Sequence, residues 1–375
     1  MAAGSADANF IAAWNGNSWQ PLGGGFNDSV FALAVCNGQL IAAGDFTASG
    51  GSVESLWRGV MTLDATAATN YVALWNGTNW QPLGLGLDYS VKALTVYNGE
   101  LIAGGRFTRA GGIDANYIAR WDGSSWQPLG AGTNDSVFAL AVYNGQLITG
   151  GRFTQAGGID VNCISRWNGG IWQPLGGGMN YSVNALAVYN GELIAGGHFS
   201  TAGGVPVNYI ARWDGSDWQP LGSGLDWGNV NALTVYNGKL IVGGYFEQVG
   251  GIDANWVAQW DGSSWQALGG GVNYDEVYAL TVYNGRLIAG GRFTYAGGEP
   301  AAHIASWGPT AVIREDLSHD CNVNEVDLGL FAAQWLNSGC EYTGFCGEAD
   351  LNYSRQVDFA DYAAFALHWL EGITP

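Results

Sequence analysis

One phrase recurs along this chain at nearly constant spacing. "IARWDGSSWQPLG" occupies residues 118–130 and returns as "IARWDGSDWQPLG" at 210–222. An Asn stands two residues before each copy, and successive copies of this Asn are 61, 46, 46, 46 and 47 residues apart. These asparagines are Asn9, Asn70, Asn116, Asn162, Asn208 and Asn255. A period of about 40–50 residues is typical of solenoids and propellers, which stack copies of one supersecondary unit.

The content of one unit distinguishes these architectures. In residues 116–161, "YIARWDG" and "SSWQPLG" are joined at Asp122-Gly123, and "VFALAVYNG" and "QLITGG" are joined at Asn144-Gly145. Asp-Gly and Asn-Gly between apolar runs predict β-hairpins, because these residues accept the positive φ angles of a type I′ turn. Two hairpins give four strands per unit, with no amphipathic helix between them. We therefore predict an all-β fold, a β-propeller, over residues 1–309.

Six units predict six four-stranded blades. In each blade "VFALAVYNG" is expected innermost, because Ala and Val suit the crowded axis, followed outward by "QLITGG", "YIARWDG" and "SSWQPLG". The chain starts with an outer pair of strands (10–22) and ends with an inner pair (277–294), so that the two halves complete one blade. A leftover "HIASWG" at 303–308 either replaces the Phe10 strand in that blade or marks a missing seventh unit.

The segment 310–375 follows a different pattern. "DLSHDCNVNEVD" (316–327) and "DLNYSRQVDFAD" (350–361) are acidic twelve-residue segments, each followed by a helical pattern. Oxygen-bearing residues at positions 1, 3, 5, 9 and 12, with a backbone carbonyl at position 7, suit Ca²⁺. Alternatively, these acids only cap the two helices. The predicted ligands of two calcium ions are Asp316, Ser318, Asp320, Asn322, Asn324 and Asp327, and Asp350, Asn352, Ser354, Gln356, Asp358 and Asp361.

These two loops, each ending in Asp and leading into one helix, resemble a dockerin. The resemblance covers about 60 residues of the tail. It implies a small α-helical domain that calcium folds, a cohesin-like partner protein, and an extracellular or cell-surface location. Cys321 and Arg355 depart from the pattern, because loop position 6 is usually Gly. Ser318 and Ser354 replace carboxylate or amide side chains, which are stronger calcium ligands.

The propeller repeat also resembles a known type. "WDGSSWQPLG" with "VYNGELIAGG" is similar to the kelch-like repeats of secreted bacterial proteins and of the fungal cortical polarity-marker family. The resemblance covers residues 9–308. Its motifs specify a fold and leave the ligand open.

Composition excludes some classes of function. The net charge of −19 and the presence of only two lysines argue against binding to nucleic acid, which requires basic surfaces. No run of 18 apolar residues predicts a membrane span. "MAAGSADANF" does not read as a signal peptide, so the extracellular expectation rests on the dockerin resemblance.

The five cysteines do not form an evident disulfide framework. Cys36 stands where other repeats have Tyr, and Cys163 does the same, so both are expected to be packed, inert thiols. Among Cys321, Cys340 and Cys346, one pair could be bridged, and the sequence does not choose which.

The loops that break the repeat are the candidate ligand-binding positions. Hairpin turns are expected on one face of the propeller, and the links between hairpins and between blades on the other. Length changes occur only in these links, at 52–66, 226–229 and 274–276. Acids and amides among aromatic residues suit sugars, although Asn and Asp also favour turns for backbone reasons. The candidate ligand-binding residues are Tyr89, Tyr181, Asp226, Trp227, Tyr274 and Asp275.

Three functions fit these patterns. The chain is expected to be an extracellular binding or scaffold protein for a glycan or protein, with no catalytic residue assigned. The alternatives are a secreted carbohydrate-active enzyme with acids such as Asp226 and Asp275 on the same face, or a purely structural surface component. Loop-stapling ion pairs of Arg106 with Asp114, and of Arg152 with Asp160, are also expected.

Overall fold

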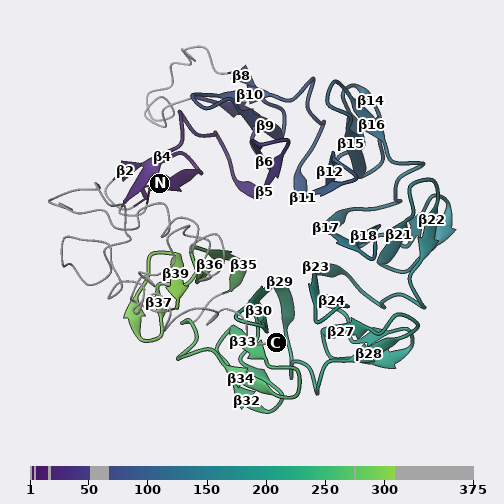
Figure 1. The fold of residues 1–375 in the computed structure, drawn as a ribbon, viewed down its shortest axis with the longest axis vertical. Coiled ribbons are helices and arrows are strands. Elements are labelled where there is room, and N and C mark those ends of the chain that lie inside the picture. The colour runs from purple at the N-terminus through teal and green to yellow at the C-terminus, as the bar shows by residue number, and fades with distance from the viewer. Residues whose placement is uncertain (1, 4–5, 16–17, 51–66, 274–275, 309–375) are drawn as a thin grey trace, which may run out of the picture.

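The repeated phrases form the sheets of a propeller. The computed structural model describes residues 2–3, 6–15, 18–50, 67–273 and 276–308. The predicted α-helical domain with its calcium ligands, Cys321, Cys340 and Cys346, the insertion at 52–66, and Tyr274 and Asp275 lie outside these residues. All regular structure in the described part is β-strand. Figure 1 shows the sheets arranged around a central axis.

Five blades have four strands each, in the predicted order from the axis outward. This order confirms the sequence prediction. The blades are, in turn, β5 (Val30–Cys36), β6 (Gln39–Gly44), β9 (Val72–Trp75) and β10 (Trp80–Pro82); β11 (Val91–Tyr97), β12 (Glu100–Gly105), β15 (Ile118–Trp121) and β16 (Trp126–Pro128); β17 (Val137–Tyr143), β18 (Gln146–Gly151), β21 (Ile164–Trp167) and β22 (Trp172–Pro174); β23 (Val183–Tyr189), β24 (Glu192–Gly197), β27 (Ile210–Trp213) and β28 (Trp218–Pro220); and β29 (Asn229–Tyr236), β30 (Lys239–Tyr245), β33 (Val257–Trp260) and β34 (Trp265–Ala267).

The sixth blade has three described strands, β35 (Val277–Tyr283), β36 (Arg286–Gly291) and β39 (Ile304–Trp307). The leftover "HIASWG" therefore takes the third position, where β39 pairs with β36. The hairpin of β3 (Ala12–Trp14) and β4 (Trp19–Pro21) forms a separate two-stranded sheet, which Figure 1 shows between the first and sixth blades. β39 thus stands where the Phe10 strand was expected. The expectation that residues 10–22 and 277–294 complete one blade is wrong, because β3 and β4 form a sheet of their own.

From the second blade to the sixth, neighbouring blades pack through a glycine of the second strand. A Cβ atom at Gly104 would lie 2.5 Å from Cγ1 of Val137 in the next blade, so a larger residue there would require the sheets to shift. The first blade has the buried Ala43 at this position, and its contact with the second blade accommodates the Cβ atom. In the sixth blade the same position, Gly290, meets no first-blade atom within 4 Å among the described residues. Leu33 and Val35 of β5 are correspondingly 55% and 65% exposed. The first and sixth blades thus lack the contact that joins the other neighbours.

A two-stranded hairpin links the second and third strands of each of the six blades, and one further hairpin precedes β3. An isolated bridge joins the entry loop of each blade to this hairpin, as between Leu87 and Ala110. Entry loops and links therefore share one end of the propeller, the loop face, as predicted. The hairpins are β1 (Ala2–Ala3) with β2 (Ala6–Asp7), β7 (Ala48–Ser49) with β8 (Ala67–Ala68), β13 (Arg109–Ala110) with β14 (Ile113–Asp114), β19 (Gln155–Ala156) with β20 (Ile159–Asp160), β25 (Thr201–Ala202) with β26 (Val205–Pro206), β31 (Gln248–Val249) with β32 (Ile252–Asp253), and β37 (Tyr295–Ala296) with β38 (Glu299–Pro300).

The opposite end, the turn face, carries two kinds of hairpin loop. At Asn144-Gly145 both φ angles are positive (48° and 71°), as in the predicted type I′ turn. The prediction is wrong for Asp-Gly, because Trp121 pairs with Trp126 across a four-residue loop. The Asp122 carboxylate accepts the backbone N–H groups of Ser124 and Ser125, both at 2.8 Å. This side-chain bonding stabilises the longer loop.

The same bonding predicts a pH dependence for the outer hairpin loops. Hydrogen bonds from the backbone N–H groups of Asp217 and Ser216 lower the pKa of Asp214 from 3.8 to about 2. Because the folded-state pKa lies below the unfolded value, Asp214 stabilises the fold above about pH 4 and loses this contribution as pH falls toward 2. We expect its carboxyl carbon, followed by NMR, to titrate near pH 2. Titration near pH 4 in the folded protein would contradict the loop geometry.

The two tryptophans of each outer hairpin join neighbouring units. Trp126 is 2% exposed, and its ring lies 5.5 Å from that of Trp121 in a T-shaped arrangement. Its indole N–H donates to the carbonyl oxygen of Leu83 in the preceding unit at 3.0 Å. The same bond recurs at Trp172, Trp218 and Trp265. The phrase that repeats in the sequence therefore belongs to the scaffold.

Candidate ligand-binding face

The inner strand of every blade contains one residue whose size and charge differ widely between blades, and it lies in a β-bulge. In the second blade Val91 pairs with Gly105 and Ala93 with Gly104, which leaves Lys92 as the extra residue. Bulges change the direction of a side chain and are frequent next to functional sites. The residues that follow the bulge read Ala-Leu-x-Val in all six blades. The bulged residues are Phe31, Lys92, Phe138, Asn184, Asn231 and Tyr278.

Two further positions vary at the same end of the blade. One follows the second strand, where the blades carry Asp45, Arg106, Arg152, His198, Tyr245 and Arg292. The other lies in the entry loop, where the first five blades carry Asp28, Tyr89, Asp135, Tyr181 and Trp227. Because the first and second strands are antiparallel, the start of one and the end of the other meet at the loop face. Each of the first five blades thus presents three variable residues on this face.

The entry residue and the residue after the second strand face each other in three blades. In the third blade Nε of Arg152 lies 3.2 Å from a carboxylate oxygen of Asp135. In the fourth blade the rings of Tyr181 and His198 are 5.2 Å apart and nearly perpendicular. In the fifth blade Trp227 and Tyr245 adopt the same arrangement at 5.2 Å. The same two positions therefore carry an ion pair in the third blade, an aromatic–imidazole pair in the fourth and an aromatic pair in the fifth.

These contacts correct the expected ion pairs. Arg152 pairs with Asp135 and not with Asp160. Asp160 lies directly opposite Gln155 in the β19–β20 hairpin and accepts a hydrogen bond from its amide at 2.9 Å. In the second blade Asp114 is likewise opposite Arg109, at 3.7 Å, and not beside Arg106. Cross-strand neighbours are closer than residues eight apart along the chain.

A lysine lies between the first and second blades on this face. Nζ of Lys92 is 3.7 Å from a carboxylate oxygen of Asp45 and 3.3 Å from the centre of the Phe31 ring. Burial lowers the pKa of Lys92, although Asp45 acts in the opposite direction. Arg106 extends over the ring of Phe138 in the third blade, at 5.9 Å. Cation–π contacts of this kind hold charged groups against the aromatic rings of the loop face.

A repeated polar pair supports the variable residues. The Asn134 side chain accepts the backbone N–H groups of Thr154 and Gln155 at 2.9 Å and donates to the Thr154 hydroxyl at 2.9 Å. Most blades repeat this pair, with Asn or Asp facing Thr or Ser. In the fifth blade the counterparts of Asn134 and Thr154 are Asp226 and Glu247. Among the described pairs, this is the one with two carboxylates.

The four predicted ligand-binding residues that the structure describes lie on the loop face of three different blades. Tyr89, Tyr181 and Trp227 are 54%, 52% and 41% exposed and belong to three different blades. Asp226 belongs to the supporting polar pair of the fifth blade. The bulged residues were missed by the sequence prediction. Comparing the six inner strands position by position would have shown them, because they vary within an otherwise repeated strand.

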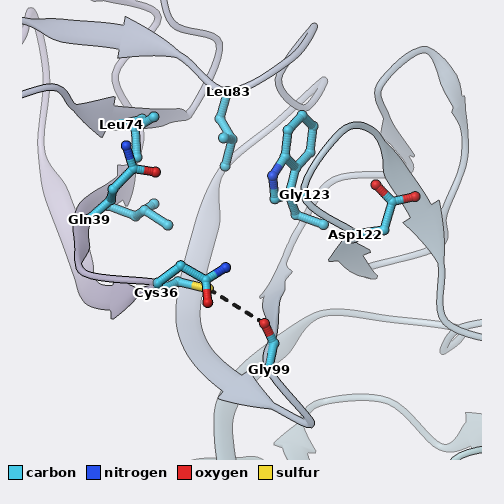
Figure 2. Close-up of a pocket in the computed structure, with 10 residues that line it drawn as sticks. Cys36, Gln39, Leu74, Leu83, Gly99, Asp122 and Gly123 are labelled. Atoms are coloured by element: carbon cyan, nitrogen blue, oxygen red, sulfur yellow. Dashed lines mark hydrogen bonds between the residues drawn. The ribbon is translucent and has the colours of Figure 1, made fainter.

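Two cavities open on the turn face. The first, of about 140 Å³, lies between the first and second blades and is lined by Cys36, Leu74 and Trp121 among others (Figure 2). The second, of about 310 Å³, lies between the fourth and fifth blades beside Tyr189 and Trp260. Cys36 and Cys163 are free and buried, and burial raises the pKa of the Cys163 thiol to about 11. A thiol with a raised pKa is unreactive near neutral pH.

The described residues show neither a metal-binding cluster nor a membrane-spanning helix. Within them, no group of three or more His, Cys, Asp or Glu side chains is placed to hold a metal ion. No helix long and apolar enough to cross a membrane occurs in this part of the chain. The sheets and the loop face together define the protein as an all-β, six-bladed propeller.

Comparison with known proteins agrees with this class. A family described as "Domain of unknown function (DUF5122) beta-propeller" matches residues 190–214. No curated protein matches the chain.

Several solved structures are similar at low identity. The computationally designed Ika8 protein is 17% identical, with 72% of each chain covered and a TM-score of 0.42. The WD40 repeats of RRP9 are 14% identical, with 71% of this chain and 74% of that chain covered and a TM-score of 0.46. The extracellular domain of BT4673, a putative hybrid two component system from B. thetaiotaomicron, is 12% identical, with 70% and 30% covered and a TM-score of 0.41. Similarities this distant carry no argument about function.

Proposed function

We propose that this chain is an extracellular, non-catalytic binding protein whose loop face recognises a glycan. The observation that supports this proposal is the contrast between the strands, which repeat almost unchanged, and the three positions per blade that differ in chemistry. Residues that depart from a repeat are not needed to build it. Binding residues concentrate in loops that a rigid scaffold positions.

The chemistry of the fourth and fifth blades favours a sugar. Trp227 and Tyr245 are 41% and 38% exposed, and Tyr181 is 52% exposed. Partly exposed rings held by a neighbouring ring offer apolar surface at low conformational cost, which suits the C–H face of a pyranose. Asp226 and Glu247 are exposed and offer carboxylate oxygens that accept hydrogen bonds from hydroxyl groups.

A glycan array followed by calorimetry with the full chain tests this proposal. We expect Trp227→Ala to weaken binding of the selected glycan by about tenfold or more, a change of about 1.4 kcal/mol or more. Trp14→Ala is the matched control, because Trp14 is 38% exposed but lies in the outer β3–β4 hairpin. The Trp14→Ala variant should bind the selected glycan with unchanged affinity. Equal losses in both variants, or no glycan bound, would favour the purely structural role.

One observation favours the alternative of a carbohydrate-active enzyme. The fifth blade has carboxylates at both positions of its supporting pair, Asp226 and Glu247, and glycosidases use two carboxylates. The expectation that Asp226 acts with Asp275 falls partly outside the described residues. If polysaccharide cleavage is detected and is lost in Asp226→Asn while glycan binding is kept, the enzyme replaces the binding protein as the conclusion.

We further propose that residues 310–375 bind two calcium ions and dock to a cohesin-like partner. The support is the pair of twelve-residue segments at 316–327 and 350–361, each followed by a helical pattern. Such a module would attach the propeller to a second protein and leave the loop face free.

A further inference from the structure

The cavity between the first and second blades is the starting point. It measures about 140 Å³ and lies on the turn face, opposite the proposed glycan site. Cys36, at its wall, is 8% exposed, and its Sγ lies 3.9 Å from the carbonyl oxygen of Gly99 in the next blade (Figure 2). Leu74, Leu83 and Trp121 form apolar walls.

The other blades show what fills this position. Tyr stands at the place of Cys36 in each of them, as Tyr97, Tyr143, Tyr189, Tyr236 and Tyr283. The Tyr236 hydroxyl donates to the carbonyl oxygen of Gly285 at 3.1 Å. Gly285 is the counterpart of Gly99 in its repeat, so Cys36 and Tyr236 point toward the same acceptor.

A second tyrosine, in the fourth blade, contacts the counterpart of another residue that lines the cavity. The hydroxyl of Tyr189 lies 3.5 Å from the carbonyl oxygen of Trp260, the counterpart of Trp121. Trp121 lines the cavity beside Cys36. The space next to Cys36 therefore overlaps the position of a phenol ring in the other blades. The equivalent cavity beside Tyr189 measures about 310 Å³ with its ring in place, so the site extends beyond the volume of one tyrosine ring.

The charge around this space differs from that of the other blades. In the second blade Arg120 forms an ion pair with Glu100 at 2.8 Å, and in the fourth blade Arg212 does so with Glu192 at 2.6 Å. The first blade replaces the arginine with Leu74 and the glutamate with Gln39, and both line the cavity. The walls are thus uncharged at these two positions, and Asp122 is the charged residue that lines the cavity.

We propose that this cavity binds small phenols, whose ring takes the place of the missing tyrosine side chain. The ring would lie among Leu74, Leu83 and Trp121, and the hydroxyl would donate to the carbonyl oxygen of Gly99. A cavity of about 150 Å³ left by truncating an apolar side chain binds benzene in another protein, so a space of this size accepts one aromatic ring. The hydroxyl supplies a stronger donor to Gly99 than the thiol of Cys36 does.

Titration of the full chain with p-cresol, followed by NMR, tests the proposal. We expect saturable binding with a dissociation constant of about 1 mM or tighter, as the size of the ligand allows. Toluene should bind about fivefold more weakly, because it has no hydroxyl to donate and leaves the carbonyl of Gly99 only the weaker thiol donor of Cys36, a difference of about 1 kcal/mol. Cys36→Ser keeps the space and should keep p-cresol binding within about twofold. Cys36→Tyr places its own phenol ring at the proposed position of the ligand ring and should abolish binding.

A second variant keeps the test independent of whether Cys36→Tyr folds. Leu74→Arg restores the residue of the second, third and fourth blades and should also abolish binding. Absence of saturable p-cresol binding to the unaltered chain overturns the proposal. So does binding that survives in folded Cys36→Tyr or Leu74→Arg, because the ring would then lie elsewhere. Glycan binding at the opposite face should be unchanged in all of these variants.

Discussion

Replacing Trp218 with Ala is expected to lower the free energy of unfolding of the propeller by about 3–5 kcal/mol. Trp218 is 1% exposed and is the largest fully buried side chain of the described residues. Its ring packs against Trp213 at 5.3 Å, and its indole N–H donates to the carbonyl oxygen of Leu175 at 3.0 Å. The substitution removes a large apolar volume and leaves the Leu175 carbonyl without its donor. Chemical denaturation followed by tryptophan fluorescence measures the change.

Trp227→Ala is the matched comparison, since the same chemical change is made nine positions away on the loop face. Trp227 is 41% exposed, so we expect a change in unfolding free energy within about 0.5 kcal/mol. The two variants should therefore separate, with Trp218→Ala losing stability and Trp227→Ala losing ligand affinity. Similar destabilisation by both would mean that Trp227 belongs to the scaffold, and the proposed site would lose its central residue.

The sequence was sufficient to predict the parts of the fold that repeat. Strand order, the Asn-Gly turns and the division into two faces follow from local patterns that occur several times, so chance similarity is averaged out. The closing of the ring did not follow in this way. Both "FIAAW" and "HIASW" carry the third-strand pattern, and only the pairing of β39 with β36 distinguishes them. Long-range pairing between equivalent strands has no local signature.

The candidate site was predicted less completely than the fold. Exposed aromatic residues such as Tyr181 and Trp227 were found because they interrupt loops of Asn, Asp and Gly. Their partners His198 and Tyr245 were not included in the candidate site, since a register must be known before cross-strand neighbours can be paired. Lys92 was missed because a bulge is a shift of register between two strands, and one strand alone does not show it.

Removing calcium is expected to unfold residues 310–375 while leaving the propeller intact. If each loop supplies its six oxygen ligands, an ion at about 100 times its dissociation constant stabilises the module by about 2.7 kcal/mol per site. A domain of this size has a small hydrophobic core, so the loss of two such contributions exceeds what it can sustain. Circular dichroism should show loss of helical signal when a chelator is added. The unfolding transition of the propeller, which contains Trp218, should not shift.

Substitutions at the last position of each loop distinguish calcium binding from helix capping. Asp327→Ala and Asp361→Ala together remove a ligand from each predicted site, and excess calcium should no longer restore the helical signal. Glu341→Ala is the matched control, because it removes an acid between the two loops and should leave the calcium response unchanged. Capping by an Asp near a helix N-terminus needs no metal. A helical signal that is insensitive to chelator, but reduced by the Asp substitutions, would therefore identify both residues as caps and end the calcium assignment.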